Sequence, residues 1–139
     1  MAKNLSGIKK RWAGYMLGII GSGRPLMTSY PYPIQVWKLG DQSIIILGGE
    51  TVVEYSIELK KIFGQDIFVL GYSNDPNMAY IPSSLILKEG GYEGKTSQMG
   101  KGLPSKWAPN IENVIIQEIK RLAMIAGVPQ GESKRIEPY

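Results

Sequence analysis

The chain has 139 residues, 43% of them hydrophobic, which is enough to form one compact domain that buries roughly 70% of its unfolded surface. Sixteen Lys and Arg residues against twelve Asp and Glu residues give a formal net charge of +4, and the only basic cluster is Lys9-Lys10-Arg11. A charge this small and this dispersed does not indicate a nucleic-acid-binding protein. The absence of cysteine excludes disulfides and thiolate metal sites, and it is compatible with a reducing or an oxidising compartment.

The N-terminal segment superficially resembles a secretory signal, because Lys and Arg residues precede a mostly apolar run from Trp12 to Ile20. The apolar residues recur at spacings of three and four, which is typical of one stripe on a helix: Ile8, Trp12, Tyr15, Met16 and Ile19. No A-x-A-like cleavage site follows, and the run is shorter than the roughly twenty residues that span a bilayer. We therefore predict an amphipathic helix that ends at Gly21-Ser22-Gly23, and neither a signal peptide nor a transmembrane segment.

The next segment predicts an extended connection followed by a β-hairpin. Prolines from Pro25 to Pro33 disfavour helix in the residues before them. Ile34 to Leu39 then alternates apolar and polar residues, Gly40-Asp41 supplies a turn, and Ile44 to Leu47 is a continuous apolar run. The two runs are predicted to pair as strands 34–39 and 43–47.

After Gly48-Gly49 the apolar spacing becomes helical, and this predicts a helix over Val52 to Phe63 with Thr51 near its cap and Gly64 after its end. A third strand is predicted over Asp66 to Tyr72. A strand-helix-strand unit of this kind has a right-handed crossover and parallel strands. The predicted fold class is α/β: a small mixed sheet with a β-hairpin and a parallel β-α-β unit, flanked by amphipathic helices.

The second half of the chain contains more glycine and fewer periodic segments. A turn at 73–77 precedes a short helix from Pro82-Ser83-Ser84 to Leu87, and Gly90 to Pro104 is predicted to be irregular because it holds five glycines in fifteen residues. Apolar spacing predicts a last amphipathic helix over Ile111 to Ile125. We interpret residues 1–126 as a single domain and residues 127–139 as a polar tail.

Two segments are predicted to face one crevice. Glu50 follows the carboxyl end of one parallel strand, and the segment from Tyr72 to Tyr80 follows the carboxyl end of its neighbour, where sites assemble in open α/β sheets. A glutamate before a helix is also favourable as a plain first-turn charge. Tyr80 and Tyr92 likewise suit ordinary half-buried aromatic positions, so the residue types alone leave a structural role open.

Longer motifs are more specific than these single residues. They are LGGE at 47–50, GYSNDPNMAYIPS at 71–83 and GGYEG at 90–94, with YPYPIQVWKLGDQ at 30–42 and GLPSKWAPNIENVIIQEI at 102–119. Together they resemble the C-terminal part of the catalytic domain of neutral/alkaline non-lysosomal ceramidases, from about Pro25 to Leu122. Enzymes of that family are zinc amidases, and the resemblance implies hydrolysis of the amide bond of ceramide or another N-acyl lipid.

The resemblance also implies roles for single residues. Glu50 corresponds to the glutamate that binds zinc in the family, and Tyr80 corresponds to its metal-binding tyrosine. Tyr92 corresponds to the tyrosine placed beside the scissile amide, and the family's spacing of twelve between the two tyrosines is kept. The chain is one residue longer than the family pattern between Asn74 and Tyr80, around Asp75-Pro76-Asn77.

The rest of the family's site has no counterpart here. The sequence contains no histidine, whereas the family holds zinc with two histidines, and its nucleophilic serine and carboxylate-binding arginine lie in upstream motifs that are missing. Zinc sites ordinarily have three or four protein ligands. We therefore expect this chain alone to bind no zinc tightly and to hydrolyse no amide, and we expect it to form a homo-oligomer or to join a partner chain, with the Trp12 stripe as a participant.

Two other classes of function stay open at this stage. One is a small binding module that uses the same crevice, with an aromatic surface and with the cluster Lys9-Lys10-Arg11 contacting an anionic partner; its aromatic residues would be Tyr30, Tyr32, Tyr72, Tyr80 and Tyr92. The other is a domain whose role is assembly with a separate catalytic chain. The resemblance gives no location for this chain, although complete relatives are often secreted or membrane-associated.

Overall fold

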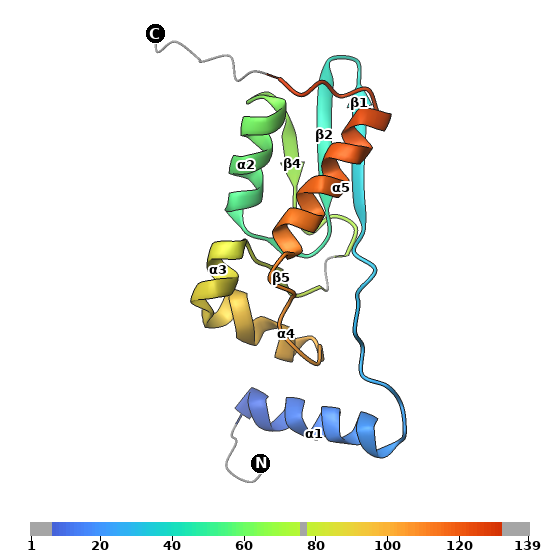
Figure 1. Cartoon of the computed structure of the whole chain (residues 1–139), viewed down its shortest axis with the longest axis vertical. Helices are drawn as coiled ribbons and strands as arrows, with labels where there is room; N and C mark the ends of the chain where they lie inside the picture. Colours follow the sequence, from blue (N-terminus) through green and yellow to red (C-terminus); the bar gives the residue numbers. More distant parts are fainter. Residues whose placement is uncertain (1–6, 76–77, 132–139) are drawn as a thin grey trace.

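The computed structural model describes residues 7–75 and 78–131 of the chain. Its central part is a three-stranded sheet in the order β1-β2-β4, built from β1 (Ile34–Leu39), β2 (Gln42–Leu47) and β4 (Phe68–Leu70). Helices α2 (Val53–Phe63) and α5 (Ile111–Ile125) lie against this sheet, and α1 (Gly7–Gly21) lies at the far end of the molecule (Figure 1). The predicted α/β class is confirmed.

The pairing of the strands is mixed, as predicted. Strand β1 pairs antiparallel with β2 from Ile34 opposite Leu47 to Leu39 opposite Gln42. Strand β2 pairs parallel with β4, with Ile44 beside Phe68. The predicted hairpin and the parallel β-α-β unit are therefore both present, but β4 is shorter than the predicted 66–72 because the chain turns after Leu70.

The hydrophobic core lies between one face of the sheet and the two long helices. The sheet contributes Ile45 and Leu47, which have no solvent exposure, and helix α2 contributes the equally buried Tyr55 and Leu59. Helix α5 adds Ile119 to the same cluster. The helical spacing of apolar residues in α2 and α5 therefore puts both helices on one side of the sheet.

The ends of the helices differ in detail from the sequence prediction. Thr51 does not cap α2, because it belongs with Glu50 to the short strand β3 (Glu50–Thr51), and the N-cap is Val52, which makes no side-chain cap hydrogen bond. Gly64 follows the end of α2 as predicted. Helix α3 (Ser84–Glu89) begins where predicted, with the Ser83 hydroxyl accepting a hydrogen bond from the Ile86 amide at 3.3 Å.

The prediction that Gly90 to Pro104 is irregular was wrong over its central part. Residues Tyr92–Thr96 form a π-helical segment, labelled η2, and Ser97–Gly100 form the short helix α4. The glycines concealed these helices, because they remove the apolar periodicity on which the prediction depended. Their packing is close: a Cβ added at Gly94 would lie 2.4 Å from the carbonyl oxygen of Ile86 in α3.

Helix α1 confirms the predicted helix, and its apolar stripe packs within the chain only in part, since Ile8 and Tyr15 are exposed. Met16 is buried, and the Trp12 indole donates a hydrogen bond to the carbonyl oxygen of Leu103 at 2.6 Å. In the described part of the predicted tail, Val128 is buried and the Gly131 amide donates to the carbonyl oxygen of Ile62 at 3.1 Å. Among the helices that the structure describes, none has the length and apolar character needed to cross a membrane.

Candidate functional site

A second, two-stranded sheet brings the predicted site residues together. Strand β3 pairs parallel with β5 (Tyr80–Ile81), and the pairing sets Glu50 directly beside Tyr80. This small sheet follows the carboxyl ends of β2 and β4 (Figure 1). Side chains at this edge come from segments that are far apart in the sequence, which is the usual location of a site in an open α/β sheet.

Two glycines allow the segments of the site to approach closely. Gly49 has a φ of 63°, and a Cβ added there would lie 2.9 Å from the carbonyl oxygen of Ala79. A Cβ added at Gly71 would lie 2.8 Å from Oγ1 of Thr51. A larger residue at position 49 would push apart the segments that carry Glu50 and Tyr80, and one at position 71 would press on the Thr51 side chain next to Glu50, so both glycines have a direct structural function.

Tyr72 is a residue to which the sequence gave no individual role, although it begins the segment predicted to face one crevice with Glu50. Its backbone lies in the left-handed region, with a φ of 56°, and its amide donates to the carbonyl oxygen of Gly49 at 2.8 Å. Hydrogen bonding to Glu50 is the main cause that raises the pKa of the Tyr72 phenol, and desolvation and the Glu50 charge act in the same direction. Its place directly after a strand end was the available sequence signal.

Tyr80 also interacts with Glu50. Hydrogen bonding to the Glu50 carboxylate, together with desolvation and the charges of Glu50, Tyr72 and Glu93, raises the pKa of Tyr80 to about 12. Tyr92 packs edge-on against the Tyr80 ring, with the ring centroids 5.7 Å apart and the planes at 74°. The structure therefore brings together Glu50, Tyr80 and Tyr92, and it adds Tyr72 and Glu93.

Two other tyrosines of the suggested aromatic surface form hydrogen bonds with the loops next to Glu50. The Tyr32 hydroxyl donates to the carbonyl oxygen of Gly48 at 2.7 Å, and the Tyr30 hydroxyl donates to the Asp75 carboxylate. The Asp75 carbonyl oxygen in turn accepts the Gly49 amide at 2.8 Å. Tyr30 and Tyr32 thus hold the loops next to Glu50. The extra residue expected around Asp75-Pro76-Asn77 concerns positions 76 and 77, which lie outside the described residues.

The donor atoms of the site fit part of a metal-binding shell. Carboxylate and phenol oxygens of Glu50 and Tyr80 are adjacent, and oxygen is an accepted ligand for zinc. A phenol with a raised pKa is neutral near pH 7, so it would bind a metal only where the metal's own charge displaces its proton. Within 7–75 and 78–131, no three side chains of the His, Cys, Asp and Glu types are grouped as a metal site. The residues present therefore supply two donors and not a complete zinc shell.

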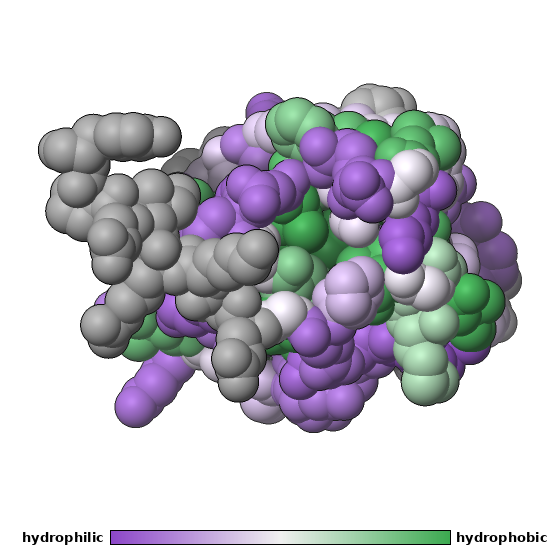
Figure 2. Space-filling view, turned by 90° about the horizontal axis from the view of Figure 1, so that it is seen from above, coloured by the Kyte–Doolittle hydropathy of each residue, from purple (hydrophilic) through white to green (hydrophobic). Residues whose placement is uncertain are grey.

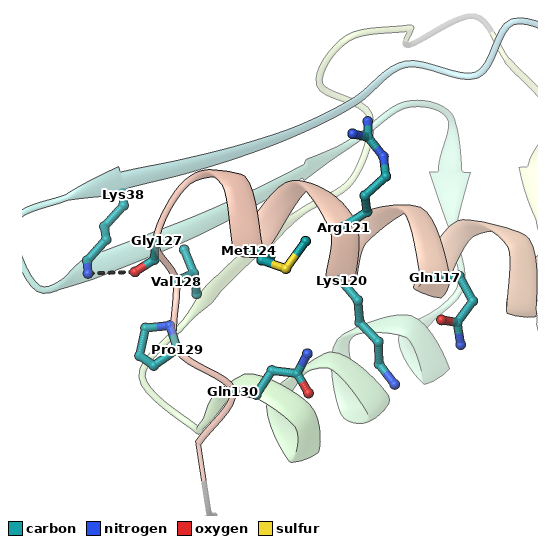
Figure 3. A pocket seen from close by; sticks show the side chains of 9 residues that line it. All are labelled: Lys38, Gln117, Lys120, Arg121, Met124, Gly127, Val128, Pro129 and Gln130. Carbon is teal, nitrogen blue, oxygen red and sulfur yellow. Dashed lines mark hydrogen bonds between the residues drawn. The ribbon is translucent and has the colours of Figure 1, made fainter.

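A separate groove occupies the opposite end of the sheet, next to the C-terminal end of α5. It has a volume of about 720 Å³ and mixes basic and apolar side chains, among them Lys38, Lys120, Arg121 and Met124. Seen from this end, apolar residues show between hydrophilic ones (Figure 2). Lys38 and Arg121 are already engaged, because Lys38 donates to the Gly127 carbonyl oxygen at 2.7 Å (Figure 3) and Arg121 pairs with Glu118 at 2.6 Å. The Glu118 carboxylate offsets the charge of Arg121, whereas Lys38 keeps its charge and is held in place by the neutral carbonyl.

An apolar cleft lies closer to the predicted site. It has a volume of about 330 Å³ and lies between the segment that precedes β1 and the start of α5, with Tyr30, Leu103 and Trp107 among its lining residues. The Trp107 indole also donates to the Tyr80 carbonyl oxygen at 2.8 Å, so this cleft adjoins the backbone of the site.

Comparison with known proteins gives no match: no protein-family model, no curated protein and no solved structure matches this chain.

Proposed function

We propose that this chain carries the C-terminal portion of a zinc-dependent amidase site that resembles the site of neutral ceramidases. Its substrate class is then the amide bond of ceramide or another N-acyl lipid. The observation that carries the proposal is the strand register that sets Glu50 beside Tyr80, with the Tyr92 ring against Tyr80. Those are the residues to which the motif resemblance gives roles.

The proposed roles follow from the chemistry of the side chains. Glu50 and Tyr80 would hold the metal, which when bound polarises a carbonyl and lowers the pKa of bound water. Tyr92 is 59% exposed on the rim, where its hydroxyl can donate a hydrogen bond to a substrate oxygen. Loss of one such donor to a developing oxyanion costs about 3–4 kcal/mol in other enzymes. Tyr72 positions Glu50 through its own hydroxyl.

The chain alone is proposed to be inactive. The sequence holds no histidine, and removing two imidazoles from a four-ligand site lowers zinc affinity by orders of magnitude. A histidine-bearing polypeptide is therefore needed to complete the site.

A metal titration in two arms tests this proposal. In the first arm zinc is added to the chain alone, and we expect weak binding without fixed stoichiometry. In the second arm the chain is mixed with the N-terminal catalytic region of a family enzyme, and we expect one zinc ion per complex. Glu50→Ala should abolish this binding, whereas Glu58→Ala on the exposed face of α2 should not. Tight stoichiometric zinc binding by the chain alone, or binding in the complex that survives Glu50→Ala, would show that the site is misplaced.

A binding module without catalysis is the second candidate. It is favoured by the exposure of Tyr72 and Tyr92, which are 53% and 59% exposed and offer hydroxyl groups and ring faces to a ligand. The basic cluster at 9–11 belongs to α1, and Lys9 faces Gly91 across a neighbouring cavity. If no zinc binds in the second arm of the titration, this candidate is preferred.

A further inference from the structure

One face of the three-stranded sheet packs against the helices, and the opposite face does not. Side chains alternate between the faces along each strand. Ile34, Val36, Ile45, Leu47 and Val69 point to the helix side and belong to the core or pack against it. The opposite face, which we call the open face, carries the alternate residues Trp37, Leu39, Ile44, Ile46, Phe68 and Leu70.

The open face is apolar, and most of it is exposed to solvent. Trp37, Leu39, Phe68 and Leu70 are 49%, 60%, 56% and 43% exposed. Ile44 is half-buried and Ile46 is buried, but none of the six belongs to the core cluster. The strand register places Trp37 beside Ile44 and Ile44 beside Phe68, so the side chains form one continuous surface across the sheet. An uncovered face of a mixed sheet usually carries polar residues, whereas this one carries large apolar side chains.

The size of this surface can be compared with a stable interface. A large aromatic side chain buries about 150–250 Å², so four large apolar side chains that are about half exposed leave on the order of 400 Å² of apolar surface open. Patches of this size on soluble proteins commonly mark interaction sites. A standard interface uses about 800 Å² per partner, with an apolar centre and a polar rim. The open face supplies the centre, and Gln35 and Gln42 at its strand positions supply part of the rim.

The charge pattern favours a second copy of the chain as the occupant. The strand positions that point to the open face hold no Lys, Arg, Asp or Glu, and Lys38 on β1 points to the helix side, where it donates to Gly127. Two copies can therefore meet through this face without opposing like charges, although the chain carries a net charge of +4. A two-fold dimer needs a surface that is complementary to itself, and a flat apolar sheet face meets that condition.

We propose that the open face is a homodimer interface, in which two sheets pack face to face with α2 and α5 on the outside of each copy. This proposal places the interface on the sheet and not on the α1 stripe expected from the sequence, in which Met16 is buried and Trp12 is hydrogen-bonded to Leu103 while Tyr15 is 56% exposed. Trp37 and Phe68 lie at the centre of the proposed interface, because they flank Ile44 of the middle strand.

Sedimentation velocity of the full chain from low to high micromolar concentration tests this interface. We expect a dimer that Phe68→Lys weakens at least tenfold. Ile125→Lys is the matched control: Ile125 is also apolar and 68% exposed but lies on α5, and we expect no change in the dimer constant. Circular dichroism of each variant checks that it is folded, and both substituted side chains are exposed. Trp37→Gln, which adds no charge, should also weaken the dimer.

Tryptophan fluorescence gives a second readout that does not depend on a charge substitution. Dilution of a dimer through its dissociation range should shift the emission to longer wavelength as Trp37 becomes solvated, and Trp37→Phe should remove this shift. A chain that is monomeric at high micromolar concentration would overturn the proposal. So would a dimer that Ile125→Lys dissociates and Phe68→Lys leaves intact.

Discussion

Glu50 is the residue on which the chemistry of the site depends, because its carboxylate interacts with two phenols. The pKa values of Tyr72 and Tyr80 are both raised, with hydrogen bonding to Glu50 as the largest cause. A raised pKa keeps both hydroxyls neutral near pH 7, the state in which a phenol can donate a hydrogen bond. A cation at this place would reverse the preference, since it would stabilise the phenolate that Glu50 disfavours.

Glu50→Gln should lower the pKa of Tyr80 from about 12 towards the ordinary value of about 10. The neutral amide removes the charge that opposes ionisation of the phenol. Carbon-detected NMR titration of the tyrosine rings measures this change, and Tyr80→Phe assigns the signal. Glu58→Gln, which removes an exposed partner of Lys61, should leave the Tyr80 titration unchanged.

The same shift predicts how stability depends on pH. Because the folded pKa of Tyr80 is raised above the unfolded value, the stability that it contributes is fully present below about pH 10 and is lost as the pH rises through about 12. Urea unfolding of the parent and of Glu50→Gln at several pH values should show a smaller loss in the variant. Equal losses in both proteins would contradict the coupling between Glu50 and Tyr80.

Tyr72 holds an unfavourable backbone conformation next to the site, with a φ of 56°. The left-handed region costs a residue with a Cβ about 1 kcal/mol or more, and glycine escapes this cost. Tyr72→Gly should therefore be more stable than Tyr72→Ala by about 1 kcal/mol in urea unfolding, since both variants lose the same phenol. Equal stability of the two variants would show that the backbone is relaxed at this position.

At the level of elements, the long periodic segments were predictable and the short ones were not. The change from alternation to helical spacing at Gly48-Gly49 predicted β2, α2 and the parallel strand β4 in the correct order. Strands β3 and β5 hold two residues each, which is too short to show any periodicity. Glu50 and Tyr80 were still predicted to lie in one region, because sites form beyond the carboxyl ends of parallel strands. The same rule placed the segment that begins at Tyr72 in one crevice with Glu50, but the left-handed backbone of Tyr72 leaves no sequence pattern, so no individual role was predicted for it.

Close packing of η2 against α3 positions Tyr92, and Gly94 allows it. Gly94→Ala should destabilise the fold by about 2–4 kcal/mol, because the added Cβ would meet a backbone carbonyl oxygen at 2.4 Å, which cannot move as a side chain would. Gly18→Ala in α1 is the matched control. No atom lies within 4 Å of its added Cβ, and alanine in a helix interior should stabilise by about 0.5–1 kcal/mol. Thermal unfolding of both variants measures the contrast, and similar effects would contradict it.

At the scale of the whole molecule, α1 is attached at one end and takes no part in the central core. Its buried residue Met16 lies outside the cluster formed by the sheet, α2 and α5. The connection through residues 24–33 separates it from β1, and its main polar anchor is the hydrogen bond from Trp12 to the Leu103 carbonyl oxygen. Because α1 covers Leu103 and packs on α4, its contribution is to the end of the molecule that carries η2 and Tyr92.

Removing residues 1–23 should therefore leave a chain that still unfolds cooperatively, with a loss of about 1–3 kcal/mol from the exposure of the surface around Leu103. Trp12→Ala in the full chain should reproduce most of this loss, since it removes both the indole packing and the hydrogen bond. Leu17→Ala, on the same helix but 59% exposed, should change stability by less than about 0.5 kcal/mol. Urea unfolding followed by circular dichroism measures all three proteins. If the truncated chain is unfolded, α1 is instead part of the folding core. If the truncated chain is as stable as the parent, the contact between α1 and Leu103 contributes nothing to stability.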